Sequence, residues 1–510
     1  MMKKTIKKLL AALLAVAMVC AMAIPAFAGT EGDITTWHSF SAFQIFKGKV
    51  EGNDIKDFKI SNVEWGSNIA DDAAAFLDQL KSADTIGPLF TKANSAQDVL
   101  AVISQWNNSD ANSIAFARFV CHYLYPNANA NPTPAVTGGS DALTFNEAGY
   151  YLVVDTTPFN PGDFDHAYNS FLLMVTHANW NVPITPKAEK PSVEKKVFDN
   201  FDNQDGTSTG VFGSSADHAI NEKFQFQLTA TLPASTDHAY DYYDTYAVCF
   251  KDTLSQGITY DGLDSVVIES KGNPGNRYDI TDSSTIDISK LESQNYFEVN
   301  IADVRKCADA AELDLNAGAT ITVTYTAHLN EKAYVNIGSG STENKNSVQL
   351  KYSNNPRPGD YWGTTPKSEV YVFTYQLNNT KRAETENGTP LPGAVFQLYS
   401  DKDCTQEVKL YKVGNIYYPI KDATDKNKDA VQMISGQDGQ FNVKGLDAGT
   451  YYLKEITPPS GYSACADKEI VISATHDVNH VSLSGESNLN NKIINKKAGG
   501  ITLPSTGGIG

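Results

Sequence analysis

Long stretches of alternating apolar and polar residues are the feature that most restricts the fold of this 510-residue chain. The alternating runs are rich in β-branched and aromatic residues, and Gly, Asn, Asp or Pro bound them. This pattern predicts antiparallel sheets that each bury one face, and therefore β-sandwich modules. The clearest runs are residues 223–232, 319–329, 347–352, 370–377 and 468–474.

The first part of the chain carries a second pattern. In "DAAAFLDQLKS" and "SIAFARFVCHYLY" the apolar residues recur at helical spacing. Proline-rich segments at residues 183–191 and 352–367 divide the chain further. We therefore predict a mainly β protein of three tandem Ig-like sandwiches, the first with helical insertions. The expected domains are residues 29–187, 188–366 and 367–500.

The N-terminal 28 residues have the pattern of a secretory signal peptide. Four lysines precede an apolar stretch, and Ala26-Phe27-Ala28 gives the small-x-small cleavage pattern. The formal net charge of -18 opposes binding to nucleic acid or to an anionic membrane. We expect a secreted protein.

The five cysteines beyond residue 28 are widely spaced and form no CxxC pair, so neither a zinc site nor another metal site is expected. An exported chain can form disulfides. Cys404 with Cys465 is the predicted pair, and Cys249 with Cys307 is a second candidate. Cys121 has no evident partner.

The segment "GTYYLKEITPPSGY", residues 449–462, places an acid inside an apolar strand. Alternation puts Tyr451, Leu453 and Glu455 on one face, so Glu455 is buried if Leu453 faces the core. A buried carboxylate must be protonated or paired. In the alternative interpretation, Tyr452 and Lys454 face inward and Glu455 faces solvent.

This segment resembles the E-box of Cna B-type domains, with Ile456 in place of the usual Thr. "TYQLNNTKRAETENGTPLPGAVFQLY" resembles the start of such a domain. The resemblance implies that Lys381 attacks the side-chain amide of Asn495, releasing ammonia and forming an isopeptide bond, with Glu455 as the catalytic acid. Asn490 and Asn491 are rival acceptors.

Burial suits this chemistry. It lowers the pKa of a lysine, which must be neutral to act as a nucleophile, and raises the pKa of an acid that must hold a proton. Holding the amine and the amide in contact supplies further acceleration. No cofactor is implied.

The middle module contains "KPSVEKKV", "CFKDTLSQGITY" and "NSVQLKYSNNP". These segments resemble the middle domain of backbone pilins and imply a second isopeptide bond, from Lys195 to Asn346 with Asp252 as the acid. Three rival acids lie just upstream of Asp252, namely Asp237, Asp241 and Asp244.

The chain closes with a short motif, Leu503, Pro504, Ser505, Thr506 and Gly507, which resembles the LPXTG sorting signal of Gram-positive surface proteins. The resemblance implies that a sortase cysteine attacks the carbonyl of Thr506 and splits the Thr506–Gly507 bond. The usual apolar helix and basic tail do not follow, so we expect a chain truncated from a membrane-anchored precursor.

The attack leaves Thr506 bound to the sortase cysteine as a thioester. A lysine of a second subunit could then attack this thioester. "NWNVPITPK" resembles the pilin motif, which implies Lys187 as that nucleophile, with Lys190 as a rival. The likeness to backbone pilins of the SpaA type, in sortase-assembled Gram-positive pili, covers essentially the whole mature chain.

The resemblance implies the structural shaft subunit of a cell-surface pilus, polymerised by a class C sortase and attached covalently to the cell wall. Its implied partners are identical pilin subunits, the pilus sortase, the housekeeping sortase, minor pilins, peptidoglycan and host-surface ligands. The alternative is a wall-anchored adhesin, or a minor pilin of the tip or base. A secreted enzyme is disfavoured because no HExxH or GxSxG motif is present.

Overall fold

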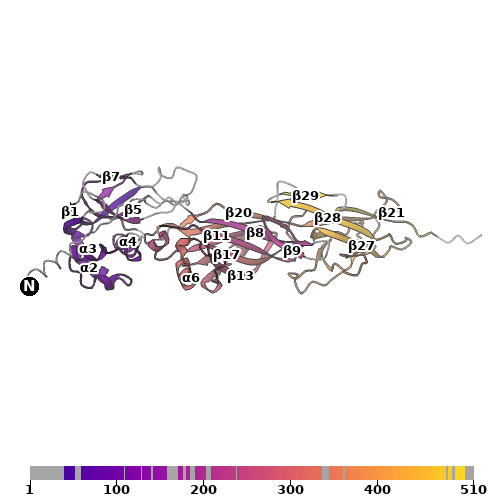
Figure 1. Ribbon diagram of the computed structural model, residues 1–510. Coiled ribbons are helices and arrows are strands. Elements are labelled where there is room, and N and C mark those ends of the chain that lie inside the picture. The colour runs from indigo at the N-terminus through magenta and orange to yellow at the C-terminus, as the bar shows by residue number, and fades with distance from the viewer. Residues whose placement is uncertain are drawn as a thin grey trace, which may run out of the picture.

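The chain forms three bodies arranged in a row in the computed structural model (Figure 1). We call them the N-terminal, middle and C-terminal bodies. They span residues 39–183, 190–373 and 375–499 within the described part of the chain. The structure describes residues 39–51, 59–107, 110–127, 129–138, 142–157, 170–175, 180–183, 190–202, 208–236, 238–335, 344–359, 362–477, 480–484 and 489–499.

A five-stranded sheet in the order β2-β1-β5-β6, with β3 paired to β1, forms the centre of the N-terminal body. Its central strand β5 (Gly149–Asp155) is buried on both faces. Tyr150 and Leu152 meet the helices on one face, and Tyr151 and Val153 pack in a second apolar cluster. The other elements are β1 (Phe40–Glu51), β2 (Lys59–Trp65), η2 (Ala70–Asp72), α2 (Ala73–Ser82), η3 (Gly87–Phe90), α3 (Ala96–Ile103), α4 (Ala111–Leu124), β3 (Val136–Thr137), β4 (Ala142–Phe145), β6 (Ser170–Val175) and β7 (Trp180–Pro183).

The two runs with helical spacing are helices α2 and α4, as predicted. Phe76 and Leu80 lie four residues apart on α2 and point into the core, which explains why this stretch is stable as a helix against the sheet. No helix among the described residues is long and apolar enough to cross a membrane.

The middle body is a sandwich of two sheets. The six-stranded sheet has the order β14-β13-β17-β11-β8-β9, and the seven-stranded sheet has the order β10-β20-β18-β12-β16-β15, with β19 paired to β18. Its elements are β8 (Ser192–Asp202), β9 (Ser208–Gly213), β10 (Ser215–Asp217), β11 (Lys223–Leu232), η4 (Ala239–Tyr242), β12 (Val248–Leu254), β13 (Ile258–Ser270), β14 (Arg277–Asp279), η5 (Thr281–Ser283), β15 (Ser284–Asp287), α5 (Leu291–Gln294), β16 (Tyr296–Ile301), α6 (Val304–Ala310), η6 (Leu315–Ala317), β17 (Ala319–Leu329), β18 (Lys345–Ser353), β19 (Trp362–Thr364) and β20 (Ser368–Phe373).

The C-terminal body is a smaller sandwich of two five-stranded sheets, β23-β24-β26-β21-β30 and β25-β22-β27-β28-β29. Its first and last strands, β21 and β30, pair in parallel. The strands are β21 (Tyr375–Ala383), β22 (Val395–Tyr399), β23 (Leu410–Val413), β24 (Ile416–Pro419), β25 (Met433–Ile434), β26 (Asn442–Leu446), β27 (Gly449–Thr457), β28 (Lys468–Asp477), β29 (His480–Ser484) and β30 (Asn490–Asn495).

The alternating runs of the sequence are strands, and their apolar residues face the core. β11 and β17, which pair over their full length, coincide with the runs predicted at residues 223–232 and 319–329. The predicted mainly β fold with helices in the first body is therefore confirmed.

The middle and C-terminal bodies are packed closely together. The Ile220 amide donates to the Gly445 carbonyl at 2.9 Å. Gly445 has φ of 90°, and a Cβ atom there would lie 2.5 Å from the Ile220 side chain. Asn221 Nδ2 donates to Tyr411 Oη at 3.2 Å. Tyr411 and Tyr418 of the C-terminal body pack in the apolar cluster of the middle body, so this cluster extends across the boundary between the two bodies.

Candidate functional site

Three predicted residues meet inside the C-terminal body. Lys381 on β21, Glu455 on β27 and Asn495 on β30 are all buried. Lys381 Nζ lies 2.5 Å from Asn495 Oδ1 and 3.1 Å from Glu455 Oε1. Asn495 Nδ2 donates to the same Glu455 oxygen at 2.8 Å. We call these three residues the C-terminal triad.

Strand alternation places the triad in the core. Tyr451, Leu453 and Glu455 are the buried positions of β27, so the interpretation with Glu455 facing inward is correct. The ring of Phe396 lies 5.1 Å from Lys381 Nζ and is stacked on Phe441. The lysine amine therefore lies against aromatic rings and contacts the side chains of Glu455 and Asn495.

The rival acceptors have other partners. Asn491 is buried, but its Nδ2 donates to Asn379 Oδ1 at 3.0 Å. Asn490 Oδ1 accepts from Asn378 Nδ2 at 3.0 Å. Among the three asparagines, Asn495 is the one that contacts Lys381.

The sequence did not indicate that Cys465 borders the triad. Its amide donates to Glu455 Oε2 at 2.8 Å, and its Sγ lies 3.6 Å from Lys381 Nζ. Burial raises the pKa of the Cys465 thiol to about 11. The thiol therefore stays protonated at neutral pH, and the backbone of this residue holds the acid in place.

The predicted disulfide between Cys404 and Cys465 is absent, because both residues are free thiols. Cys404 sits in a turn with φ of 53°, and its Sγ lies 3.9 Å from Asp467 Oδ2. Cys465 instead points toward the triad. Cys249 and Cys307 are also free, as is Cys121, which is buried as an apolar residue.

A second group of predicted residues meets inside the middle body. Lys195 on β8 comes from the six-stranded sheet, and Asp252 on β12 and Asn346 on β18 come from the seven-stranded sheet. All three are buried. Lys195 Nζ donates to Asp252 Oδ2. We call this group the middle triad.

Tyr325 on β17 joins the members of the middle triad. Its Oη accepts from Lys195 Nζ at 3.1 Å and from Asn346 Nδ2 at 2.5 Å, and it donates to Asp252 Oδ1 at 3.2 Å. Asn346 Oδ1 has no hydrogen-bond partner among the described residues. The tyrosine thus holds the amide beside the amine while the amide oxygen stays open to a proton donor.

The electrostatics of the middle triad favour uncharged reactants. Burial lowers the pKa of Lys195 to about 8, against the opposing effect of Asp252. Burial also raises the pKa of Asp252. The two shifts favour a neutral amine beside a protonated carboxyl group, which are the forms that amide attack requires.

The rival acids of the middle body lie elsewhere. Asp241 Oδ1 accepts from Asn316, and Asp244 pairs with Arg118 and with His122 of the N-terminal body. Asp237 lies outside the described residues, as do the predicted signal peptide, Lys187 and the motif from Leu503 to Gly507.

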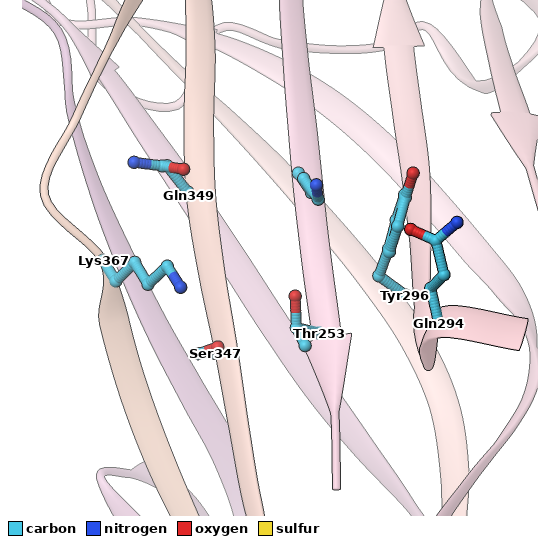
Figure 2. A pocket seen from close by; sticks show the side chains of 7 residues that line it. Thr253, Gln294, Tyr296, Ser347, Gln349 and Lys367 are labelled. Carbon is cyan, nitrogen blue, oxygen red and sulfur yellow. The ribbon is translucent and has the colours of Figure 1, made fainter. Parts of the chain in front are cut away.

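A polar pocket lies on the outer face of the seven-stranded sheet of the middle body (Figure 2). Lys251 and Thr253 flank Asp252 on β12 and point outward into this pocket, beside Tyr296. The pocket contains no triad residue. The residues of both triads are buried between the two sheets of their own sandwich, apart from this pocket.

Comparison with known proteins identifies the class of the C-terminal body. Residues 377–487 match the family model described as the SpaA prealbumin-like fold domain. No curated protein matches the chain.

Three similar solved structures are major or backbone pilins. The T6 backbone pilin of Streptococcus pyogenes serotype M6 is 17% identical, with a TM-score of 0.48, 91% of this chain covered and 97% of that chain. The major pilin SpaD of Corynebacterium diphtheriae is 20% identical, with a TM-score of 0.41 and 69% and 80% covered. The C-terminal fragment of the major pilin GBS80 of Streptococcus agalactiae is 22% identical, with a TM-score of 0.42 and 60% and 100% covered.

Proposed function

We propose that this protein is the structural shaft subunit of a Gram-positive cell-surface pilus, strengthened by two intramolecular isopeptide bonds. The observation that carries the proposal is the pair of buried triads, one in each of two successive sandwiches. A buried lysine beside both an acid and an amide is costly for stability alone, and its cost is explained if the residues react.

The proposed reaction in the C-terminal body joins Lys381 and Asn495. The lone pair of Nζ attacks Cγ of the asparagine while Glu455 donates a proton toward the amide oxygen. The Cγ–Nδ2 bond then breaks, the single proton released by the amine leaves with Nδ2 as ammonia, and the proton lent to the amide oxygen returns to Glu455 as the new amide carbonyl forms. Lys195, Asp252 and Asn346 perform the same steps in the middle body. The chain acts only on itself and is not a turnover enzyme.

The two proposed isopeptide bonds would join different parts of their sandwiches. A Lys381–Asn495 bond would join neighbouring parallel strands, the first and the last of the C-terminal body. A Lys195–Asn346 bond would join the two sheets of the middle body across its core. Both would oppose separation of strands when the shaft is pulled.

The covalent links that we propose between subunits are inferred from sequence motifs. We propose that a pilus sortase cleaves between Thr506 and Gly507 and transfers the Thr506 carbonyl to Lys187 of the next subunit. A housekeeping sortase would attach the finished fibre to peptidoglycan, and minor pilins would share the same machinery. The expected boundary at residue 366 precedes β20, which pairs with β18 and β10 of the middle body, so the domains would be residues 29–187, 188–373 and 374–500.

Replacement of Lys187 tests this function. In cells carrying the pilus sortase, Lys187→Ala should abolish the ladder of covalent polymers seen after boiling in detergent, and the matched change Lys190→Ala should leave it intact. A ladder unchanged by Lys187→Ala would reject Lys187 as the nucleophile, whereas the lack of any ladder from the wild-type protein would favour the alternative, a wall-anchored adhesin or a minor tip or base pilin.

A further inference from the structure

A histidine and two carboxylates converge where the middle and C-terminal bodies meet. His218 and Glu222 lie between β10 and β11 of the middle body, and Asp447 lies between β26 and β27 of the C-terminal body. One ligand atom from each residue lies within 4.8 Å of the other two. Neither isopeptide triad contains any of the three residues.

The His218 ring is fixed in one orientation. It is fully buried and stacks on Phe224, with ring centroids 4.1 Å apart and an interplanar angle of 2°. Its Nε2 lies 2.7 Å from the carbonyl oxygen of Phe198. Because a carbonyl only accepts hydrogen bonds, Nε2 carries the proton, and Nδ1 of the neutral ring presents its lone pair.

The Nδ1 atom of this ring faces Glu222. His218 Nδ1 has no hydrogen-bond partner among the described residues, and Glu222 Oε1 lies 3.6 Å away, beyond hydrogen-bond distance. Metal-binding histidines commonly donate their other ring N–H to a backbone carbonyl, as His218 does. The ring is therefore oriented as in a metal site.

The carboxylates crowd one another. Glu222 and Asp447 each bring a carboxylate oxygen within 4.8 Å of the other and of a ring nitrogen of His218. Lys421 Nζ is 4.0 Å from Glu222, on its Oε2. A divalent cation among these oxygens would offset the repulsion at a buried position.

We propose that His218, Glu222 and Asp447 bind a divalent transition metal of the zinc class, which clamps the middle body to the C-terminal body. One imidazole nitrogen and two carboxylate oxygens are a suitable ligand set for zinc, whereas calcium takes oxygen ligands alone. Tetrahedral zinc needs ligand atoms about 3.4 Å apart, so the carboxylates must close by small rotations. The clamp would lie beside the Ile220–Gly445 hydrogen bond.

Zinc titration of the full chain, freed of metal with EDTA and carrying no affinity tag, tests the proposal. Calorimetry should show one bound zinc, with affinity lowered at least tenfold by Glu222→Gln and by Asp447→Asn. The matched control Asp264→Asn, at an exposed acid on β13, should bind as the wild type does. Circular dichroism verifies that each variant is folded.

Absence of saturable zinc binding would overturn the proposal, as would affinity unchanged in both Glu222→Gln and Asp447→Asn. In that case His218 and Glu222 form only an internal polar contact. If both variants fail to fold, the wild-type chain alone decides the matter. One equivalent of zinc must then raise its unfolding temperature, with calcium giving no comparable shift, and a zinc-insensitive temperature rejects the site.

Discussion

Lys381 and Asn495 face each other from the first and last strands of the C-terminal body, with Nζ of the lysine 2.5 Å from Oδ1 of the asparagine. The strands that carry them, β21 and β30, pair in parallel, so a bond between the two side chains would link the entry and the exit of this body. Tension along the chain would then pass through that bond.

Glu455→Gln should leave the C-terminal body unlinked, because the amide cannot supply the carboxyl proton. The variant chain should retain one ammonia, about 17 Da, that the wild type has lost. Its C-terminal body should lose about 5 kcal/mol of unfolding free energy, by analogy with a cross-link that closes a loop of this length. The residues joined are 114 positions apart.

The control for this prediction is Glu386→Gln, since Glu386 is an exposed acid that pairs with Lys492. It should have the mass loss and the denaturant midpoint of the wild type. A Glu455→Gln chain with the fully linked mass would show that Glu455 is not the acid.

Tyr325→Phe should slow formation of the middle bond without blocking it. The ring is kept, but the hydroxyl that joins Lys195, Asp252 and Asn346 is lost. We expect bond formation to slow roughly 100-fold, the lower end of what a proton-transfer group contributes. Mass spectra of freshly made protein should show linked and unlinked chains together, converting over time.

Tyr260→Phe is the matched control, because the Tyr260 ring lies 5.7 Å from the Tyr325 ring. This variant should be fully linked. Equal delays in the two variants would mean that Tyr325 acts only through packing.

Asn346→Ala should create a middle body whose stability rises with pH. Lys195 stays free in this variant, and burial lowers its pKa from 10.5 to about 8. Between these values the unfolded chain binds more protons than the folded chain, so unfolding free energy increases with pH by about 1.4 kcal/mol per unit. The destabilisation is complete below about pH 8.

Denaturant unfolding at pH 8.0, 8.5, 9.0 and 9.5, pH values chosen below the usual range of tyrosine titration (about 10), measures this slope. The double variant Lys195→Met, Asn346→Ala removes the titrating amine and should lack the slope. The linked wild type should lack it too, because its Lys195 is an amide. A slope shared by all three proteins would assign the effect to another group.

Thiol titration of the denatured, unreduced chain should find all five cysteines beyond the signal segment free. Reduction should then leave its electrophoretic mobility unchanged. A count of three thiols, restored to five by reduction, would restore the Cys404–Cys465 disulfide that the structure lacks.

The strands could be predicted from local alternation, and the residues of the two triads from the resemblance to known domains. Alternation placed Glu455 on the face of Leu453, and the resemblance to Cna B-type domains implied Lys381 and Asn495. The resemblance also favoured Asn495 over Asn490 and Asn491, and the parallel pairing of β21 with β30, which no local pattern specifies, brings Asn495 to Lys381.

Other features of the sites depend on contacts between distant segments. Tyr325 is one of many inward tyrosines on alternating strands, so its sequence context does not distinguish it from a packing residue. The sequence predicted a disulfide between Cys404 and Cys465 because both lie in the C-terminal body. Spacing along the chain does not determine the direction in which a thiol points. The cluster of His218, Glu222 and Asp447 forms only when two bodies pack together.

Intact-mass spectrometry of the reduced, secreted chain tests the central claim most directly. Two internal bonds predict a mass about 34 Da below that calculated from the mature sequence, one ammonia for each triad. Peptide mapping should then place the cross-links at Lys381–Asn495 and Lys195–Asn346. A chain at its full calculated mass would contradict the account, because it would leave both lysines buried, intact and unreacted.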